Sequence, residues 1–281
     1  MYRWDSAQSL RDRGRQIGGM FRRLRNTVNL GKVPWLTIGQ KITSTLVPPR
    51  CVLCGGPGQV GNELWGLDLC RHCESACPRH FACHGGSTVG ITAPAPAPDH
   101  HSFEGLDAVH ALFVYDDPVD RLITGLKFRG ELACGRVLGT LLARHLAALG
   151  LRLPQALVPM PLHMARHRER GFNQAEAIAT HVARRAGVPI DSSSLQRTRA
   201  TAPQTTLGAI ERRRNCAGAF AVRPGHRVPR RVALIDDVMT TGSTAAAAAD
   251  ALRAAGARQV QLWVCAVALR GDAAWPGDQG W

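Results

Sequence analysis

The sequence predicts an α/β protein with a doubly wound, mostly parallel sheet, preceded by a small cysteine-rich module. Two observations support this fold class. From Phe103 onward, short apolar segments typical of buried strands alternate with segments typical of helices. Before that point, residues 48–86 hold six of the nine cysteines. With 281 residues, the chain is long enough for one sizeable core and a smaller module.

The alternation predicts four strands and four helices. We expect strands at Ala108–Tyr115, Ala156–Pro161, Val232–Ile235 and Gln259–Ala268. We expect helices at Val119–Phe128, Arg136–Leu149, Asn173–Ala186 and Ser243–Ala255. Ligands of such sheets bind beyond the carboxyl ends of the strands. The loops that follow the strands are therefore where we expect a site.

Composition divides the chain into five parts. We expect a flexible basic extension at residues 1–47, the cysteine-rich module at 48–86 and a linker at 87–102. The main domain follows at residues 103–271, and a tail at 272–281. The linker contains the alternating run Ala93–Pro98, whose prolines favour a semi-rigid, extended chain. The extension is either a mobile arm or the product of an upstream start, with Met20 as the true initiator.

The charge of the chain is strongly positive and unevenly distributed. The net charge is +14, and residues 1–50 carry ten Lys and Arg against two acids. Further basic groups concentrate in His163–Arg170 and Arg212–Arg214. Such a balance suits polyanionic partners, either nucleic acid or phosphorylated small molecules. The alternative is genomic, because many arginines beside only three lysines are also typical of translation from GC-rich DNA.

The hydropathy of the chain predicts no membrane insertion. No apolar run approaches the roughly 20 residues of a membrane-spanning helix. Residues 1–30 also lack the apolar centre of a secretory signal. We therefore expect a cytoplasmic protein, in which cysteines serve as metal ligands or free thiols rather than in disulfides.

Four cysteines form two pairs at a spacing typical of zinc sites. Fifteen residues separate Cys51-x-x-Cys54 from Cys70-x-x-Cys73. Each such turn aims two thiolates at one tetrahedral ion, so we expect all four to bind one zinc. A four-cysteine site leaves no position for water, so the zinc would be structural. The alternatives are buried apolar cysteines and a redox dithiol, and Cys77 and Cys83 remain unassigned.

The residues from Val232 to Thr244 contain the most informative motif. Four apolar residues lead into Asp236 and Asp237, and a turn rich in hydroxyls and glycine precedes an alanine-rich helix. Gly242 lets the backbone approach a ligand closely, and the start of the helix favours a phosphate. The acid pair suits ribose hydroxyls or a divalent metal. Together these groups describe a site for a phosphorylated ribose.

Two other interpretations of this motif exist. The strand could carry the metal-binding acids of a P-loop NTPase, but the chain contains no Gly-x-x-x-x-Gly-Lys-Ser/Thr loop. It could also be an ordinary strand, turn and helix with a solvated acid pair and a threonine cap. The coherence of the whole block favours the ligand site.

The block resembles the phosphoribosyl-pyrophosphate (PRPP) loop of type I phosphoribosyltransferases. Joined to an N-terminal zinc ribbon, it resembles one family specifically, the competence-associated ComF family. The segments that carry this resemblance are Ala111–Gly130, Val158–His163, Arg168–Gln174, Arg199–Leu207 and Arg212–Phe220. The resemblance covers roughly residues 48–270 and implies a type I phosphoribosyltransferase-like fold.

The resemblance also implies roles for individual residues. The PRPP-binding set would be Asp236, Asp237, Val238, Met239, Thr240, Thr241, Gly242, Ser243 and Thr244. The two aspartates would be the catalytic pair, and Mg²⁺ would accompany PRPP as a cofactor. Candidates for the pyrophosphate side are Arg166, Arg168 and Arg170. Candidates in a loop that closes over the ligand are Arg199, Gln204 and Thr205.

Two functional hypotheses follow from the resemblance. In the first, the protein is a phosphoribosyltransferase that displaces pyrophosphate from ribose C1 with a nitrogen nucleophile. In the second, it is a non-catalytic accessory factor of natural competence, with a vestigial or regulatory nucleotide site. The second implies partners such as single-stranded DNA, a competence helicase and recombination proteins. The sequence contains no identifiable acceptor site that would decide between the two.

Overall fold

The computed structural model describes residues 48–60, 66–80, 105–199 and 218–268. The chain divides into two compact units, Met1–Pro48 and Pro49–Trp281, and nearly all described residues belong to the second. The predicted basic extension, linker and tail lie outside the described residues. So do Gln204, Thr205 and Cys83.

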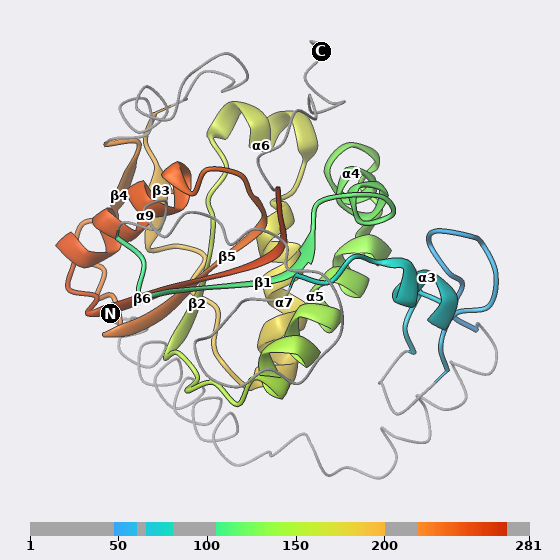
Figure 1. The fold of residues 1–281 in the computed structure, drawn as a ribbon. Helices are drawn as coiled ribbons and strands as arrows, with labels where there is room; N and C mark the ends of the chain where they lie inside the picture. The colour runs from blue at the N-terminus through green and yellow to red at the C-terminus, as the bar shows by residue number, and fades with distance from the viewer. Residues whose placement is uncertain (1–47, 61–65, 81–104, 200–217, 269–281) are drawn as a thin grey trace, which may run out of the picture. The chain divides into compact units, whose positions relative to one another are not determined.

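The core of the second unit is a parallel sheet of four strands. In spatial order these are β1 (Ala108–Val114), β6 (Gln259–Val267), β5 (Arg231–Met239) and β2 (Ala156–Pro159). Each neighbouring pair is parallel, as Figure 1 shows. These are the four strands that the sequence predicts, and the two longest lie at the centre of the sheet, where both neighbours cover their backbone.

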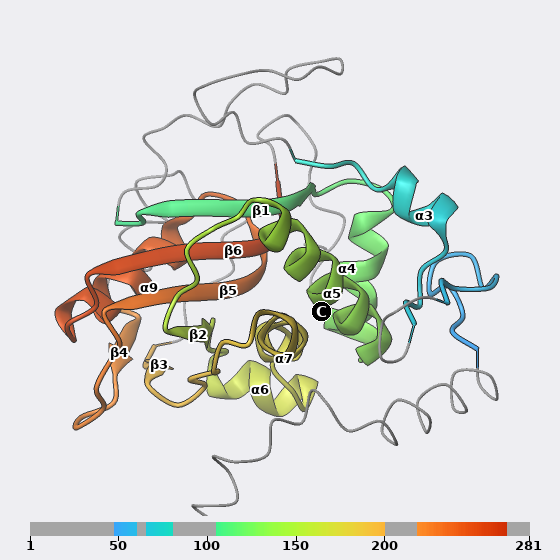
Figure 2. The same cartoon turned by 90° about the horizontal axis from the view of Figure 1, so that it is seen from below.

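Helices cover both faces of the sheet (Figure 2). Along β5, Ala233 and Ile235 pack into one apolar cluster with residues of α4 (Val119–Arg129), α5 (Leu132–Ala148) and α7 (Gln174–Ala186). Val232 and Leu234 pack into a second cluster with α9 (Ser243–Ala254). Because successive strand residues point to opposite faces, this alternation shows a sheet buried on both sides. The predicted doubly wound α/β class is confirmed.

The structure adds short elements that the sequence pattern does not predict. They are α3 (Arg71–Ala76), α6 (Met164–Arg170), β3 (Leu195–Arg197) and β4 (Phe220–Val222). β3 and β4 form a separate antiparallel pair. Each is too short for hydrophobic periodicity to reveal it. Two predicted bounds shift by four residues, because α5 begins at Leu132 rather than Arg136 and β5 continues to Met239. In addition, β2 ends at Pro159 rather than Pro161.

The cysteine-rich module packs directly on the edge of the sheet. Residues 78–80 run antiparallel to β1, where the backbone N–H of Val114 donates to Pro78 at 2.9 Å and that of His80 donates to Leu112 at 3.0 Å. Asp68 pairs with Arg136 at the start of α5. Leu67 and Leu69 are buried in the same apolar cluster as α5. The described part of the module thus shares its core with the main domain.

In the part of the chain that the structure describes, none of the helices combines the length and the apolar character needed to cross a bilayer.

Candidate functional site

The four cysteines of the two predicted pairs come together at one point. Their four sulfur atoms all lie within 4.8 Å of one another; the residues are Cys51, Cys54, Cys70 and Cys73. Gly55, with φ of 73°, turns the chain back after the first pair, and its N–H donates to Cys51 at 2.8 Å. In the second pair, Cys70 caps α3 and its sulfur accepts from the N–H of Cys73.

The geometry of this cluster fits zinc. A tetrahedral ion with Zn–S bonds of about 2.3 Å requires sulfur atoms roughly 3.8 Å apart. The sulfurs of Cys54 and Cys70 are 3.8 Å apart. Burial opposes ionisation of Cys51, but backbone hydrogen bonds from Cys70, Cys54 and Leu53 outweigh it and lower its pKa to about 6. Burial and the neighbouring thiols raise the pKa of Cys73. A backbone hydrogen bond from Gly56 acts to lower the pKa of Cys54, but the thiols of Cys51 and Cys70 raise it.

Cys77 does not join the cluster. Its sulfur donates to the carbonyl of Cys73 at 3.2 Å, and its side chain is buried in the main core. Burial raises the pKa of this thiol to about 11. Cys77 is therefore a packing residue, which answers a question that the sequence left open.

The second candidate site lies at the carboxyl end of β5, where the strand loses one of its neighbours. β2 pairs with β5 only as far as Ile235, whose carbonyl accepts from the N–H of Met160 at 2.9 Å. β6 continues to pair with β5 as far as Met239. The last four residues of β5 therefore keep one ladder partner, and the edge toward β2 opens where Asp236 and Asp237 lie.

The two carboxylates face opposite sides of the sheet. Asp236 follows the alternation of Val232 and Leu234, toward α9, whereas Asp237 follows that of Ala233 and Ile235, toward α4. Asp236 lines a pocket beside α9, and Asp237 is absent from that lining. The two acids are adjacent in the sequence, but their side chains lie in different environments because they point to opposite faces of the sheet.

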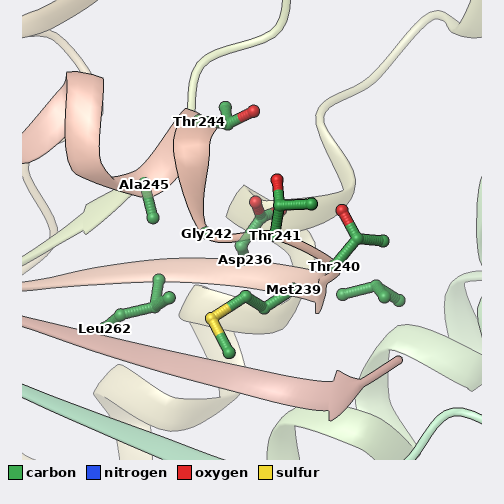
Figure 3. Close-up of a pocket in the computed structure, with 9 residues that line it drawn as sticks. Asp236, Met239, Thr240, Thr241, Gly242, Thr244, Ala245 and Leu262 are labelled. Carbon is green, nitrogen blue, oxygen red and sulfur yellow. The ribbon is translucent and has the colours of Figure 1, made fainter. Parts of the chain in front are cut away.

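The pocket beside Asp236 is built from the turn that leads into α9. Its lining contains seven of the nine residues predicted to bind PRPP: Asp236, Val238, Met239, Thr240, Thr241, Gly242 and Thr244. Ala245 and Leu262 complete it. Figure 3 shows the side chains of the three threonines projecting to the same side of the turn. Ser243 is buried, and its hydroxyl lies 2.9 Å from that of Thr241.

Gly242 gives this turn its shape. Its φ of 74° lies in the left-handed region, which a side chain disfavours, and it occupies the cap position of α9. Gly242 has no side chain that could cap the helix, and the Thr241 hydroxyl accepts from the N–H of Ser243 at 3.5 Å. The first backbone N–H groups of a helix have no partner within it, and together with the dipole they attract an anion. The threonine cap considered from sequence is therefore present in part, through the long hydrogen bond to Thr241.

The environment of Asp236 makes its negative charge costly. Its burial and the neighbouring Asp237 carboxylate raise the pKa of Asp236 to about 7, although Lys127 and Arg197 act in the opposite sense. One carboxylate oxygen of Asp236 accepts from the N–H of Asp237 at 2.9 Å. Strongly shifted acids in a pocket are typical of functional sites.

Lys127 meets Asp237 on the other face of the sheet. Its ammonium nitrogen, from the last turns of α4, lies 3.0 Å from a carboxylate oxygen of Asp237. Both side chains are largely buried, with 16% and 9% of their surface exposed. No motif in the sequence indicates a role for Lys127 itself. The available signal was its rarity, because it is one of three lysines and the only one beyond residue 41.

The predicted pyrophosphate-side arginines lie on α6, in the connection that follows β2. Arg166 and Arg168 are exposed, whereas Arg170 is partly buried and its guanidinium lies over the ring of Phe128, 5.3 Å from its centre. Burial and the charge of Arg166 lower the pKa of Arg170, and Asp237 partly offsets them. Arg170 thus shares an electrostatic environment with Asp237.

The predicted closing loop begins and ends beside α9. Its described ends are β3 and β4, and both contact that helix. Arg199 is exposed just after β3, while Gln204 and Thr205 lie outside the described residues. Arg197, which no sequence motif indicates, lies over the ring of Phe220, and its charge acts to lower the pKa of Asp236. Arg197 therefore belongs to the surroundings of the site.

Several curated proteins are similar to the chain over most of its length. It is 35% identical over 235 residues to the DNA utilization protein YhgH of Escherichia coli strain K12, covering 77% of this chain and 96% of that protein. It is 32% identical over 223 residues to Competence protein F of Haemophilus influenzae, with 76% and 95% covered. It is 28% identical over 226 residues to Competence protein ComFC of Streptococcus pneumoniae, with 76% and 98% covered.

The other two comparisons contribute less. No family model matches the chain. Among solved structures, the chain is 21% identical to TT1426 of Thermus thermophilus, with a TM-score of 0.31, covering 50% of this chain and 86% of that one. A likeness at that level supports no argument about the fold or the site.

The cysteine cluster generates a prediction about metal content. We expect Cys70→Ser to lose about one equivalent of zinc per chain, because a closed site needs all four thiolates. Cys77→Ser is the matched control and should keep its zinc, since its thiol donates to a carbonyl instead. Elemental analysis of the purified proteins measures both. Zinc retained by the Cys70 variant would refute the ligand set.

The shifted pKa of Asp236 generates a prediction about stability. Between its ordinary value of 3.8 and about 7, the unfolded state has ionised Asp236 while the folded state still holds the proton. Stability from this group therefore falls as pH rises through that window. We expect the free energy of unfolding of Asp236→Asn, relative to that of the wild type, to be higher at pH 8 than at pH 5 by on the order of 2 kcal/mol.

Urea unfolding at several pH values measures this difference. Asp250→Asn is the matched control, because Asp250 is exposed on α9 and the same substitution there should change stability little at any pH. A gain for Asp236→Asn that is equal at pH 5 and pH 8 would contradict the prediction.

Proposed function

The chain belongs to the ComF family, and on this premise we propose that the carboxyl end of β5 binds PRPP or a related phosphoribosyl ligand together with Mg²⁺. The observation that carries the proposal is the position of the two adjacent carboxylates. On one side, Asp236 adjoins a glycine-capped helix start suited to a phosphate. On the other side, Asp237 pairs with Lys127 of α4 and its charge influences Arg170 of α6. A ribose with phosphate groups at both ends would place one anionic group at the helix start and the other near the cationic groups.

The turn between β5 and α9 would hold the 5′-phosphate. The backbone N–H groups at the start of α9 would donate to the phosphate oxygens, and Gly242 allows the close approach. The hydroxyls of Thr240, Thr241 and Thr244 would add donors at the same pocket. All of these groups are fixed by the strand and the helix, so little ordering would be needed on binding.

The two aspartates would bind the sugar. Each carboxylate would accept hydrogen bonds from a ribose hydroxyl, and Asp236 must lose its proton to do so with both oxygens. Oxygen donors of this kind also fit Mg²⁺, which prefers carboxylates, water and phosphate oxygens. When bound, Mg²⁺ would neutralise part of the pyrophosphate charge. Three arginines of α6 would also bind the pyrophosphate: Arg166, Arg168 and Arg170.

If the protein is catalytically active, the reaction at this site is displacement of pyrophosphate at ribose C1. The C1–O bond to pyrophosphate breaks and a bond to a nitrogen nucleophile forms, with the electron pair leaving on pyrophosphate. The loop between β3 and β4, to which Arg199, Gln204 and Thr205 belong, would exclude water from the reacting carbon. Pyrophosphate release in a screen of nucleobases measures turnover separately from binding.

Binding itself is tested by calorimetry with PRPP and Mg²⁺. We expect a dissociation constant of about micromolar order for the wild type. The double variant Asp236→Asn with Asp237→Asn should show no binding, because it removes both carboxylates from the sugar side. The Asp250→Asn protein controls for a general effect of the substitution. Absence of heat with the wild type would exclude the ligand.

A second proposed function concerns DNA. The relatives carry the names DNA utilization protein and Competence protein, which favour a role in DNA uptake for this chain as well. The net charge of +14 and the ten basic residues among the first fifty suit the backbone of single-stranded DNA. In this role, a helicase and recombination proteins of the competence system would be partners.

Deletion of residues 1–47 tests the contribution of the basic extension. We expect the full chain to bind single-stranded DNA with an affinity that falls steeply with salt, and the shortened chain to bind more weakly with a shallower salt dependence. The deletion should stop there, because residues 78–80 pair with β1 and their loss would damage the sheet. Equal affinity of both chains would exclude the extension as a contact surface.

A further inference from the structure

The Lys127–Asp237 ion pair occupies an unusual position for a structural contact. Its 3.0 Å separation places an ammonium group directly on a carboxylate that the proposed function assigns to the ligand. The two residues come from different elements, α4 and β5, so the pair depends on the fold. With 16% and 9% of their side chains exposed, both are shielded from water but not sealed from it.

A bound cation and this ammonium group would compete for the same carboxylate. Lys127 already supplies a positive charge to Asp237, and its charge also lowers the pKa of Asp236. A divalent ion placed on Asp237 would be repelled by Lys127 at short range, in surroundings where water screens poorly. An anionic ligand has the opposite effect, because its phosphate oxygens offer the ammonium group a new partner.

We infer that Lys127 is a displaceable counter-ion of Asp237. It holds the carboxylate in the free protein, keeps divalent cations away, and moves to the phosphate oxygens of the ligand when that ligand arrives with its metal. The inference rests on the proposed phosphoribosyl site. It makes Lys127 a positioning residue for the buried carboxylate of Asp237. It also requires that metal and phosphorylated ligand bind together rather than in sequence.

A purely structural ion pair makes different predictions. If Lys127 only braces α4 against β5, its removal destabilises the fold and leaves the site without new affinity for cations. If Lys127 is a displaceable counter-ion, its removal uncovers a carboxylate that a cation can take. Cation binding by the free protein separates the two roles, because a structural role alone would not increase it.

The experiment measures binding of Mn²⁺ alone by electron paramagnetic resonance, in the full-length protein without PRPP. We expect Lys127→Met to bind Mn²⁺ more tightly than the wild type by on the order of ten-fold, because the methionine keeps much of the side-chain length and removes the charge. Lys127→Arg should restore the weak wild-type binding. Arg121→Met, an exposed position on the same helix, should leave it unchanged.

Two further variants keep the test decisive. Lys127→Gln is a second neutral replacement, in case the methionine variant fails to fold. Adding Asp237→Asn to the neutral variant should abolish the gained Mn²⁺ affinity and show that the ion binds at that carboxylate. Unchanged Mn²⁺ affinity in the folded neutral variants would overturn the inference, as would a gain that survives loss of Asp237.

PRPP binding forms a separate arm of the experiment. With Mg²⁺ present, the neutral variants should bind PRPP more weakly than the wild type, because the ligand loses the ammonium partner. If Mn²⁺ binding rises as expected but no variant binds PRPP, the proposed phosphoribosyl ligand is wrong and the competition for Asp237 stands. If PRPP binds while Mn²⁺ affinity stays unchanged, the ligand site stands and the counter-ion role fails.

Discussion

The pairing of β5 with β6 beyond the end of β2 is the constraint on which the candidate site depends. Because β6 holds β5 as a strand to Met239, Asp236 and Asp237 occupy fixed, alternating positions instead of a loose turn. Because β2 ends at Pro159, the edge of β5 beside them has no strand partner on the side of β2. The apolar residues Val232–Ile235, buried on both faces of the sheet, anchor this arrangement. The buried part of β5 thus fixes the positions of the two carboxylates.

The same alternation sets the electrostatics of the site. Asp236 lies on the side of α9, where its burial and the nearby Asp237 favour the protonated acid. Asp237 lies on the side of α4, where Lys127 compensates its charge. The ammonium group of Lys127 pairs directly with only one of the two acids, Asp237. The cost left at Asp236 is typical of sites in which function is maintained against stability.

The cysteine module is joined to this frame rather than tethered beside it. Residues 78–80 cover the outer edge of β1, and Asp68 pairs with Arg136 of α5. An exposed parallel edge strand offers unpaired backbone groups to other chains, and the module covers part of that edge. A zinc ion on the four cysteines would hold the covering segment in place, since the module has little core of its own. The cysteine cluster and the candidate ligand site are thereby parts of one folding unit.

The sequence by itself determined the strand and helix alternation, the four cysteine ligands and the motif from Val232 to Thr244, because each is a local pattern with a fixed spacing. It also identified the family. Only the tertiary structure decided that β5 extends through the acids, that Cys77 packs in the core, and that Lys127 pairs with Asp237. Residues 127 and 237 lie on different elements, so no local pattern relates them. Their contact exists because α4 packs on the face of the sheet to which Asp237 points.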